Sequence, residues 1–226
     1  MRNHFLLLFA FLLASASTIE SSTSNSSDDM SRLPMKTFER DGNIYCLDSS
    51  GEEIQITEAG VDSAPSLSVD QKLVTFVREN QLIKSEDVFM EVPATEIWEA
   101  PVDGSRAPSI VVKHDQLLTG GNAILRNFSN PVFSNDSSEI YFLVDCWVTS
   151  RALYSVKTSD SSTRFMTDAN FLEVVRSGWK SGCIIVQKHK YFVGGGSYDW
   201  YWLISPKGET IGPLGEGLDY FKENNL

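Results

Sequence analysis

The apolar residues of this chain alternate with polar residues over short stretches, and turn-forming residues interrupt the alternation about every ten positions. Typical stretches are LVTFV (73–77), IWEAP (97–101), EIYFL (139–143) and LYSVK (153–157). Clusters of Asp, Gly and Ser follow most of them, and almost no stretch has the spacing of an amphipathic helix. The pattern therefore predicts an all-β fold built from short antiparallel strands.

One segment of the chain is duplicated. Residues 63–77 read SAPSLSVDQKLVTFV and align without a gap with residues 129–143, SNPVFSNDSSEIYFL. Each copy predicts a strand, a polar turn and a second strand. Asp70 and Asp136 occupy the same place in the two turns, where a carboxylate can accept hydrogen bonds from nearby backbone amides. We therefore interpret both as structural turn residues and not as catalytic groups.

A second motif follows each copy and also occurs near the start and the end of the chain. It consists of an aliphatic–aromatic pair, an alternating strand and a turn, and its copies are IYCLDSSGE (44–52), IWEAPVDGS (97–105), LYSVKTSDS (153–161) and WYWLISPKGET (200–210). The motifs define a half unit and three full units, at 43–57, 64–113, 130–167 and 172–211. Four-stranded antiparallel sheets repeated every ~40–50 residues are typical of β-propeller blades.

The duplicated segments resemble the repeat of TolB-like β-propellers, whose fuller form reads P-x-W-S-P-D-G-K. The matching residues are Pro65, Ser68, Asp70, Lys72, Val74 and Phe76 in the first copy and Pro131, Phe133, Ser134, Asp136, Ile140 and Phe142 in the second. Val69 and Asn135 stand where the family has its second Pro, and Gln71 and Ser137 stand where it has Gly. The resemblance covers roughly residues 40–211 and implies a β-propeller or partial propeller of about four four-stranded antiparallel blades.

The number of units is low for this family. TolB-like propellers commonly have about six blades, whereas the motifs account for about 3.5 units. An open row of blades would expose sheet edges and apolar faces. The sequence leaves two arrangements open: a small ring of about four blades, or a partial propeller that closes by self-association.

Three consecutive glycines, Gly194, Gly195 and Gly196, lie between two aromatic runs in HKYFVGGGSYDWYWLIS (189–205). A phosphate-binding loop needs a strand before it and a helix N-terminus after it, but the residues that follow predict a strand. The spacing also fits neither G-x-G-x-x-G nor a Walker motif. We therefore interpret the three glycines as the turn between two strands, where positive φ is needed. No cofactor is expected.

The strand after these glycines is aromatic on both faces. Packing between neighbouring blades explains Trp200 and Trp202, because a blade has a neighbour on each face. The alternative is an exposed aromatic patch that binds a partner or a sugar, with Tyr198, Trp200 and Trp202 as its contact residues. The sequence does not decide between these two interpretations.

Residues that could carry chemistry are few. His114 and His189 are the histidines outside the first few residues, and neither lies in a recognisable catalytic frame with a Ser or Cys nucleophile. The spacings of acidic residues fit no calcium loop, and the three cysteines form no zinc motif, so no metal site is expected. Whether two of Cys46, Cys146 and Cys183 form a disulfide is left open. We expect a protein that is not an enzyme.

The N-terminus predicts a targeting segment. Residues 1–16 contain Arg2, an apolar run and the small-residue pattern Ala-Ser-Ala, which together are typical of a cleaved secretory signal peptide. Residues 17–37 are polar and predict a flexible leader. The propeller domain is expected at 38–220, followed by a short tail at 221–226. No later run is apolar and long enough for a membrane helix.

The formal net charge of the 226-residue chain is −11. Such a charge repels phosphate backbones and anionic lipid, which excludes nucleic acid as an expected partner. Asn25, Asn127 and Asn135 begin N-x-Ser sequons, which matter only where secreted proteins are glycosylated.

Together these features predict a non-catalytic scaffold that is periplasmic or secreted and mediates protein–protein interaction. The first alternative is a propeller that binds a small ligand or carbohydrate, and the second is a propeller-type lyase or hydrolase.

Overall fold

A computed structural model describes residues 35–84, 91–114, 126–146 and 150–225. The chain divides into two units, Met1–Arg32 and Leu33–Leu226, and every described residue belongs to the second. The predicted signal peptide, most of the predicted leader and the sequon at Asn25 lie outside the described residues.

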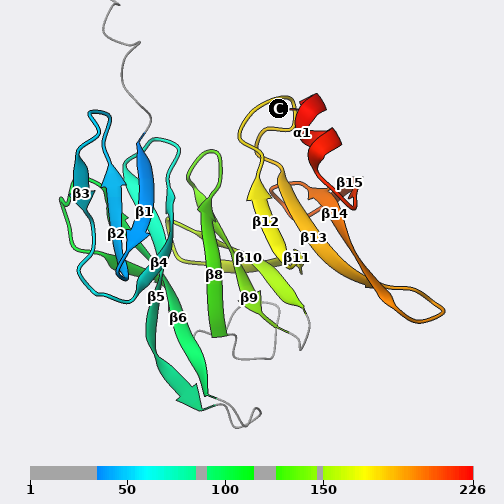
Figure 1. The fold of residues 1–226 in the computed structure, drawn as a ribbon, viewed down its shortest axis with the longest axis horizontal. Coiled ribbons are helices and arrows are strands. Elements are labelled where there is room, and N and C mark those ends of the chain that lie inside the picture. The colour runs from blue at the N-terminus through cyan, green and yellow to red at the C-terminus, as the bar shows by residue number, and fades with distance from the viewer. Residues whose placement is uncertain (1–34, 85–90, 115–125, 147–149, 226) are drawn as a thin grey trace, which may run out of the picture. The chain divides into compact units, whose positions relative to one another are not determined.

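The described residues form fifteen strands and one short helix (Figure 1). The elements are β1 (Lys36–Arg40), β2 (Asn43–Leu47), β3 (Glu53–Gln55), β4 (Asp62–Leu67), β5 (Leu73–Lys84), β6 (Glu91–Pro101), β7 (Ser109–Val112), β8 (Arg126–Phe133), β9 (Glu139–Asp145), β10 (Arg151–Lys157), β11 (Thr163–Asp168), β12 (Phe171–Val174), β13 (Ile184–Tyr191), β14 (Ser197–Ile204), β15 (Thr210–Gly215) and α1 (Asp219–Asn225).

These strands form four antiparallel sheets, each from consecutive strands of the chain. We name them sheet I (β1–β3), sheet II (β4–β7), sheet III (β8–β11) and sheet IV (β12–β15). Sheet I has three strands and the others have four. The predicted all-β fold of about four antiparallel sheets is therefore confirmed, and the half unit predicted at 43–57 falls in the three-stranded sheet.

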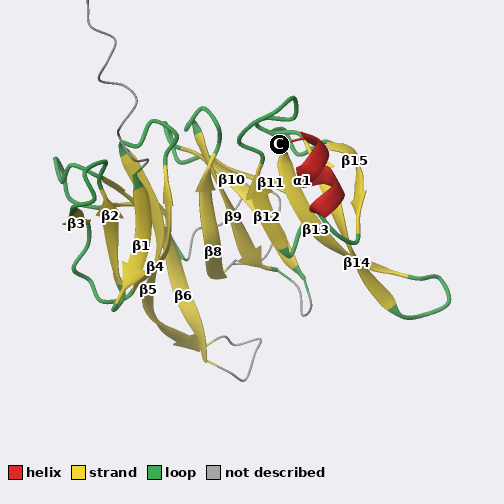
Figure 2. Cartoon of the chain, turned by 45° about the horizontal axis from the view of Figure 1, so that its top comes forward, coloured by secondary structure: helices red, strands yellow, loops and turns green. Residues whose placement is uncertain are grey.

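The sheets pack against one another in chain order. The first strands of successive sheets are in contact, β1 with β4, β4 with β8 and β8 with β12. Figures 1 and 2 show the sheets side by side, with sheets I and IV as the first and last of the row. Sheets II, III and IV thus use their first strand as the inner strand, as a propeller blade does.

Apolar side chains fill the space between each pair of neighbouring sheets. The buried core residues are Ile44, Val74, Phe76 and Ala100 between sheets I and II; Val77, Ile97, Phe128, Phe133, Phe142 and Tyr154 between sheets II and III; and Leu143, Leu153, Leu172, Ile184, Val186 and Ile204 between sheets III and IV. Alternate residues of one strand enter different cores, since Ile184 and Val186 face sheet III whereas Ile185 faces away from it.

The duplicated segments form the first two strands of sheets II and III with the same backbone geometry. Each first strand has a bulge, and its extra residue has positive φ, 50° at Ala64 and 51° at Asn130. The turns also match, with φ of 59° at Gln71 and 57° at Ser137. These two residues stand where the TolB-like repeat has Gly. Positive φ at this position explains the glycine of the repeat, because glycine adopts this conformation without strain.

Asp70 and Asp136 lie in these two turns. The Asp70 carboxylate accepts hydrogen bonds from the Ser68 hydroxyl (2.7 Å) and the Lys72 amide (3.2 Å). The Asp136 carboxylate accepts from the Ser134 hydroxyl (2.6 Å) and from the amide and hydroxyl of Ser138. The serine hydroxyls lower the pKa of both carboxyl groups below the usual value, since they stabilise the ionised form.

The predicted domain ends need correction at both sides. β1 begins at Lys36, inside the predicted leader 17–37, because its pairing with β2 orders the chain from that residue on. The predicted tail at 221–226 is wrong over its described part, which belongs to helix α1. Phe221 is buried against sheet IV, and this apolar contact explains why the segment is folded.

The three cysteines, left open by the sequence, form no disulfide. Cys46, Cys146 and Cys183 are all among the described residues and all carry free thiols. Burial raises the pKa of the Cys46 and Cys146 thiols above the ordinary cysteine value, so both are poor nucleophiles at neutral pH.

Candidate interaction surface

The hairpin of β13 and β14 carries the three glycines and the aromatic run. Gly194, Gly195 and Gly196 lie in the turn between the two strands, where Phe192 donates its amide to the Gly196 carbonyl (3.1 Å) and Gly195 donates to Phe192 (3.1 Å). Positive φ is found at Gly195 (95°) and Gly196 (85°) but not at Gly194. A strand follows the turn, so no helix N-terminus is present there to bind a phosphate.

Apolar side chains gather at the tip of this hairpin. We define the hairpin-tip cluster as Tyr191, Phe192, Val193, Tyr198 and Trp200. Tyr191 is 68% exposed, Phe192 is 58% exposed and Val193 is fully exposed. Figure 1 shows the hairpin extending beyond the rest of sheet IV. Large apolar residues that protrude together into solvent are characteristic of interaction sites.

Aromatic contacts order the cluster before any partner binds. The ring centroid of Tyr198 lies 4.7 Å from that of Phe192 and 5.8 Å from that of Trp200. The Trp200 contact is edge-on. Both Tyr198 and Trp200 are half-buried by these neighbours. Preordered aromatic side chains lose little conformational entropy on binding, which favours their use as anchors.

Trp202, which the sequence leaves open between packing and the aromatic patch, lies in the core. It packs against the core between sheets III and IV, beside Leu153 and Met166. Residues two apart on a strand share a face, but Trp202 lies nearer the middle of the sheet, where sheet III covers that face. The aromatic run therefore divides into two parts: Tyr198 and Trp200 belong to the surface, and Trp202 belongs to the core.

Charged contacts hold residues 188–190 of β13 to sheet III. We call these residues the hairpin base; they pair with 198–200 of β14. Lys190 binds the Asp168 carboxylate (3.2 Å), while the nearly buried Lys188 lies 3.5 Å from it and donates to the Thr167 hydroxyl. Burial raises the pKa of Asp168, but the two lysines together lower it more, and the net pKa is below the usual aspartate value. No sequence pattern predicts this cluster, because its members lie in different units of the repeat.

Both histidines bind carboxylates through Nδ1. His114 lies 2.9 Å from Glu96, whose second oxygen accepts from the Trp98 indole (3.0 Å), and Glu96 is buried. His189 lies 2.9 Å from Asp199. His114 is therefore part of a polar cluster within sheet II, and His189 supports the hairpin base.

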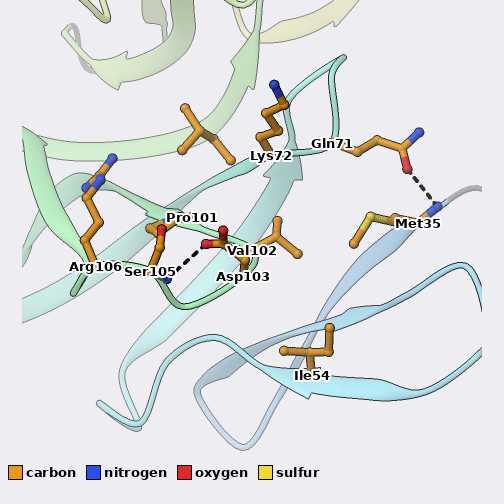
Figure 3. Close-up of a pocket in the computed structure, with 10 residues that line it drawn as sticks. Met35, Ile54, Gln71, Lys72, Pro101, Val102, Asp103, Ser105 and Arg106 are labelled. Carbon is orange, nitrogen blue, oxygen red and sulfur yellow. Dashed lines mark hydrogen bonds between the residues drawn. The ribbon is translucent and has the colours of Figure 1, made fainter.

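A cavity of about 490 Å³ lies between sheets I and II (Figure 3). Its lining includes Met35, Ile54, Leu73, Pro101 and Val102, with Lys72, Asp103 and Arg106 also at its wall. Figure 3 shows the Lys72 and Arg106 side chains directed away from the aliphatic residues. The cavity is thus an apolar gap between two sheets, with no set of converging polar groups among the residues that line it.

Within the described ranges, no group of three or more His, Cys, Asp or Glu residues is placed to bind a metal ion. No helix in the described part of the chain has the length and apolar character needed to cross a membrane.

No protein-family model matches the chain, and no curated protein matches it. Solved structures do match. The β-propeller domain of the Trilobed protease from Pyrococcus furiosus, which has an open velcro topology, is 13% identical with a TM-score of 0.51, and the match covers 75% of this chain and 47% of that one. The putative TolB from Agrobacterium tumefaciens is 15% identical with a TM-score of 0.50, covering 76% and 57%.

Dipeptidyl peptidase 4 from Porphyromonas gingivalis is 17% identical with a TM-score of 0.46, and the match covers 81% of this chain and 31% of that one. The chain therefore spans less than two thirds of the length of each of these structures. At such low identity the two higher-scoring matches carry information about fold alone. Together with the four antiparallel sheets, they support a TolB-like β-propeller fold for this chain.

Proposed function

We propose that this chain is an exported, non-catalytic scaffold that binds another protein through the hairpin-tip cluster. The observation that carries the proposal is the exposure of Tyr191, Phe192 and Val193 at the end of a hairpin whose base is fixed by ion pairs. Apolar anchors on a rigid support are what a protein partner needs for a desolvated central contact. The negative net charge favours a protein partner over nucleic acid.

Export forms part of the proposal and has its own test. Residues 1–16 have the composition of a signal peptide, so a chain made in its source cell should begin at Ser17 after cleavage. N-terminal sequencing of the purified protein checks this directly. An intact Met1 on the cellular protein would contradict export by a cleaved signal.

Site-specific photo-crosslinking tests the binding surface. A benzophenone amino acid replaces Phe192 in the full chain, and a second chain carries it at Trp179, which is 73% exposed and lies outside the hairpin. We expect position 192 to crosslink a protein that position 179 does not. The same crosslink should disappear when Val193→Asp is added, because a charge at the tip prevents desolvation.

Binding measurements with the captured partner then give the magnitude. Phe192→Ser should weaken affinity by about 10–30-fold, as expected for an anchor residue worth up to ~2 kcal/mol. Trp179→Ser serves as the matched control and should leave affinity unchanged. Equal crosslinking from both positions, or a crosslink that survives Val193→Asp, would contradict the proposal.

Carbohydrate binding is the second candidate. It is favoured by the neighbouring rings of Phe192 and Tyr198, whose centroids lie 4.7 Å apart and could stack on a sugar. Trp200 contacts Tyr198, so its fluorescence reports on ligands at this site. Saturable quenching in a glycan screen, lost in Tyr198→Ser, would support carbohydrate binding; a flat response across the screen would remove it.

A further inference from the structure

Among the described residues, sheet I has no counterpart of the strand that is innermost in the other three sheets. The turn between β2 and β3 has the same backbone hydrogen bonds as the turn between β14 and β15. The Asp48 amide donates to the Glu52 carbonyl (3.0 Å), as Ser205 does to Glu209 (2.8 Å). The Gly51 amide donates to the Asp48 carbonyl (3.1 Å), as Gly208 does to Ser205 (2.9 Å). In sheet IV this turn joins the third and fourth strands. The turn between β13 and β14, which joins a second and a third strand, has the same two bonds, so the turn alone does not number the strands. The aligned sequence motifs do: IYCLD in β2 matches IWEAP in β6, a third strand, so β1 corresponds to a second strand and β3 to a fourth.

The same arginine arrangement occurs in sheets I and II. In sheet II, Phe76 pairs across the strands with Trp98, and the guanidinium of Arg78 lies 4.2 Å from the Trp98 ring. In sheet I, Phe38 pairs with Tyr45, and the guanidinium of Arg40 lies 4.2 Å from the Tyr45 ring. Arg40 thus corresponds to Arg78, two residues after the equivalent phenylalanine.

The two arginines differ in what lies beside them. Arg78 binds Asp62 of the inner strand β4 through two hydrogen bonds (2.6 and 2.8 Å), and the Asp62 side chain is fully buried. Among the described strands, β1 pairs only with β2, so no inner strand brings a carboxylate to Arg40. Arg40 instead contacts Glu53 of β3, and both of these side chains are about half exposed.

We propose that the free edge of β1 binds an extended segment of another protein, which adds an inner strand to sheet I and places an Asp or Glu opposite Arg40. Backbone groups of a sheet edge supply affinity for such a strand, and side-chain pairs fix its register. The Arg78–Asp62 pair shows the contact that the bound segment would reproduce. Lys36 at the other end of β1 also favours an acidic segment.

The chain preceding β1 does not supply this carboxylate at the observed spacing. Asp62 and Arg78 are separated by 16 residues, and the same separation before Arg40 leads to Ser24, which has no charge. The residues around it, STIESSTSN (17–25), contain one large apolar residue, Ile19, whereas β8 contributes Phe128, Val132 and Phe133 to its sheet. A separate chain is therefore the proposed occupant.

Peptide binding to the full chain tests this site. The probe is a synthetic peptide with the sequence of residues 60–68, GVDSAPSLS, which contains β4, and its partner is the same peptide with Asp replaced by Asn. Amide hydrogen exchange in β1 and titration of a labelled peptide are the readouts. The first peptide should slow exchange in β1, and the Asn peptide should bind about tenfold more weakly because it lacks the charge-assisted contact.

Arg40→Gln should reduce affinity for the Asp peptide by about tenfold and remove the difference between the two peptides. Arg106→Gln is the matched control. The Arg106 side chain is 43% exposed, close to the 48% of Arg40, and it also pairs with a glutamate, Glu99 of β6 (2.6 Å). Phe192→Ser should leave peptide binding unchanged, so this site and the hairpin-tip cluster fail independently.

Three results would overturn the proposal. The first is no protection of β1 at millimolar peptide, or equal affinity for the Asp and Asn peptides. The second is slow exchange, in the free monomer, of the β1 amides that do not bond to β2, which would mean that this chain already covers the edge. The third is a dimer in light scattering that dissociates in Arg40→Gln, which would make a second copy the occupant.

Discussion

The inner sheets II and III differ from the end sheets I and IV in how their faces are covered. Each inner sheet has a neighbouring sheet on both faces, and the two share the duplicated segment with nearly equal φ at corresponding residues. The end sheets each have one neighbour. Sheet IV covers its outer face with α1, where Phe221 packs on Ile185 and Leu203. Sheet I presents Phe38, Tyr45 and the exposed Arg40 on its outer face.

This difference explains why the repeat is regular only in the middle of the chain. An inner sheet must fit two neighbours, so its inner strand, bulge and turn are all constrained by packing. An end sheet fits one neighbour and is free to use a helix or charged residues on the other side, as terminal repeats of other repeat proteins do.

The largest expected difference between an inner sheet and an end sheet concerns the two corresponding arginines. Arg78→Ala should lower the free energy of unfolding by about 3 kcal/mol, because it leaves the buried Asp62 carboxylate without its partner. Arg40→Ala should lower it much less, since Arg40 and Glu53 are about half exposed and solvent screens their ion pair. Chemical denaturation of both variants measures the two values.

A double variant gives the control. Arg78→Leu with Asp62→Leu removes both charges and should recover most of the loss, because no unpaired buried carboxylate remains. Equal losses for Arg78→Ala and Arg40→Ala would mean that the environments of the two arginines do not differ in energy, which would contradict the comparison between sheets I and II.

The helix that covers sheet IV gives the next largest effect. Phe221→Asp should lower the free energy of unfolding by about 2 kcal/mol, because it removes a buried aromatic ring and detaches α1. The exposed outer face of sheet IV should then cause concentration-dependent association. Calorimetry and light scattering are the measurements. Tyr220→Asp, at a side chain that is 80% exposed, should change neither quantity.

Turns of the inner sheets should make the protein sensitive to acid. The pKa values of Asp70 and Asp136 are lowered in the folded chain, so the stability they contribute is complete above the usual value of 3.8 and is lost as the pH falls below it. Asp136→Ala should cost about 1 kcal/mol at pH 7 and should reduce the dependence of unfolding on pH between about 5 and 2. An unchanged pH profile would show that other carboxyl groups dominate acid unfolding.

The inner sheets were also the part of the fold that the sequence predicted best. The duplicated prolines, serines and aspartates predicted the strands and turns of sheets II and III, because both bulge and turn geometry are encoded locally. Helix α1 was missed, since its only strong signal is Phe221, whose burial depends on sheet IV. The sequence leaves Trp200 and Trp202 open between packing and an aromatic patch, because residues two apart on a strand share a face and only the packing of sheet III separates them.

The contacts between units were not predictable from the repeat. The lysines of β13 bind Asp168 of β11, and Arg176 donates to Asn135 and to the Phe133 carbonyl across sheets III and IV. These pairs join residues at least 20 positions apart, and no local pattern specifies them. The side-chain nitrogen of Asn135 also donates to the Val175 carbonyl (3.1 Å). This is the atom that glycosylation of the sequon would modify, and in the folded chain it makes a structural hydrogen bond.

The smallest expected effect concerns the two turn residues that replace glycine. Gln71 and Ser137 have φ of 59° and 57°, a conformation that costs an L-residue about 1 kcal/mol and costs glycine almost nothing. Gln71→Gly and Ser137→Gly should each raise the free energy of unfolding by about 0.5 kcal/mol, after the larger entropy of the unfolded glycine chain is subtracted. Chemical denaturation of the single and double variants measures the gain.

A loss of stability in these variants would have a specific meaning. The Gln71 side chain accepts a hydrogen bond from the Met35 amide (3.2 Å) at the start of sheet I, and the Ser137 hydroxyl accepts one from the Val69 amide (3.2 Å) in the neighbouring sheet. Glycine removes both acceptors. A net loss would therefore show that these contacts between adjacent sheets outweigh the local strain, and that Gln71 and Ser137 stabilise the row of sheets by joining one turn to the next.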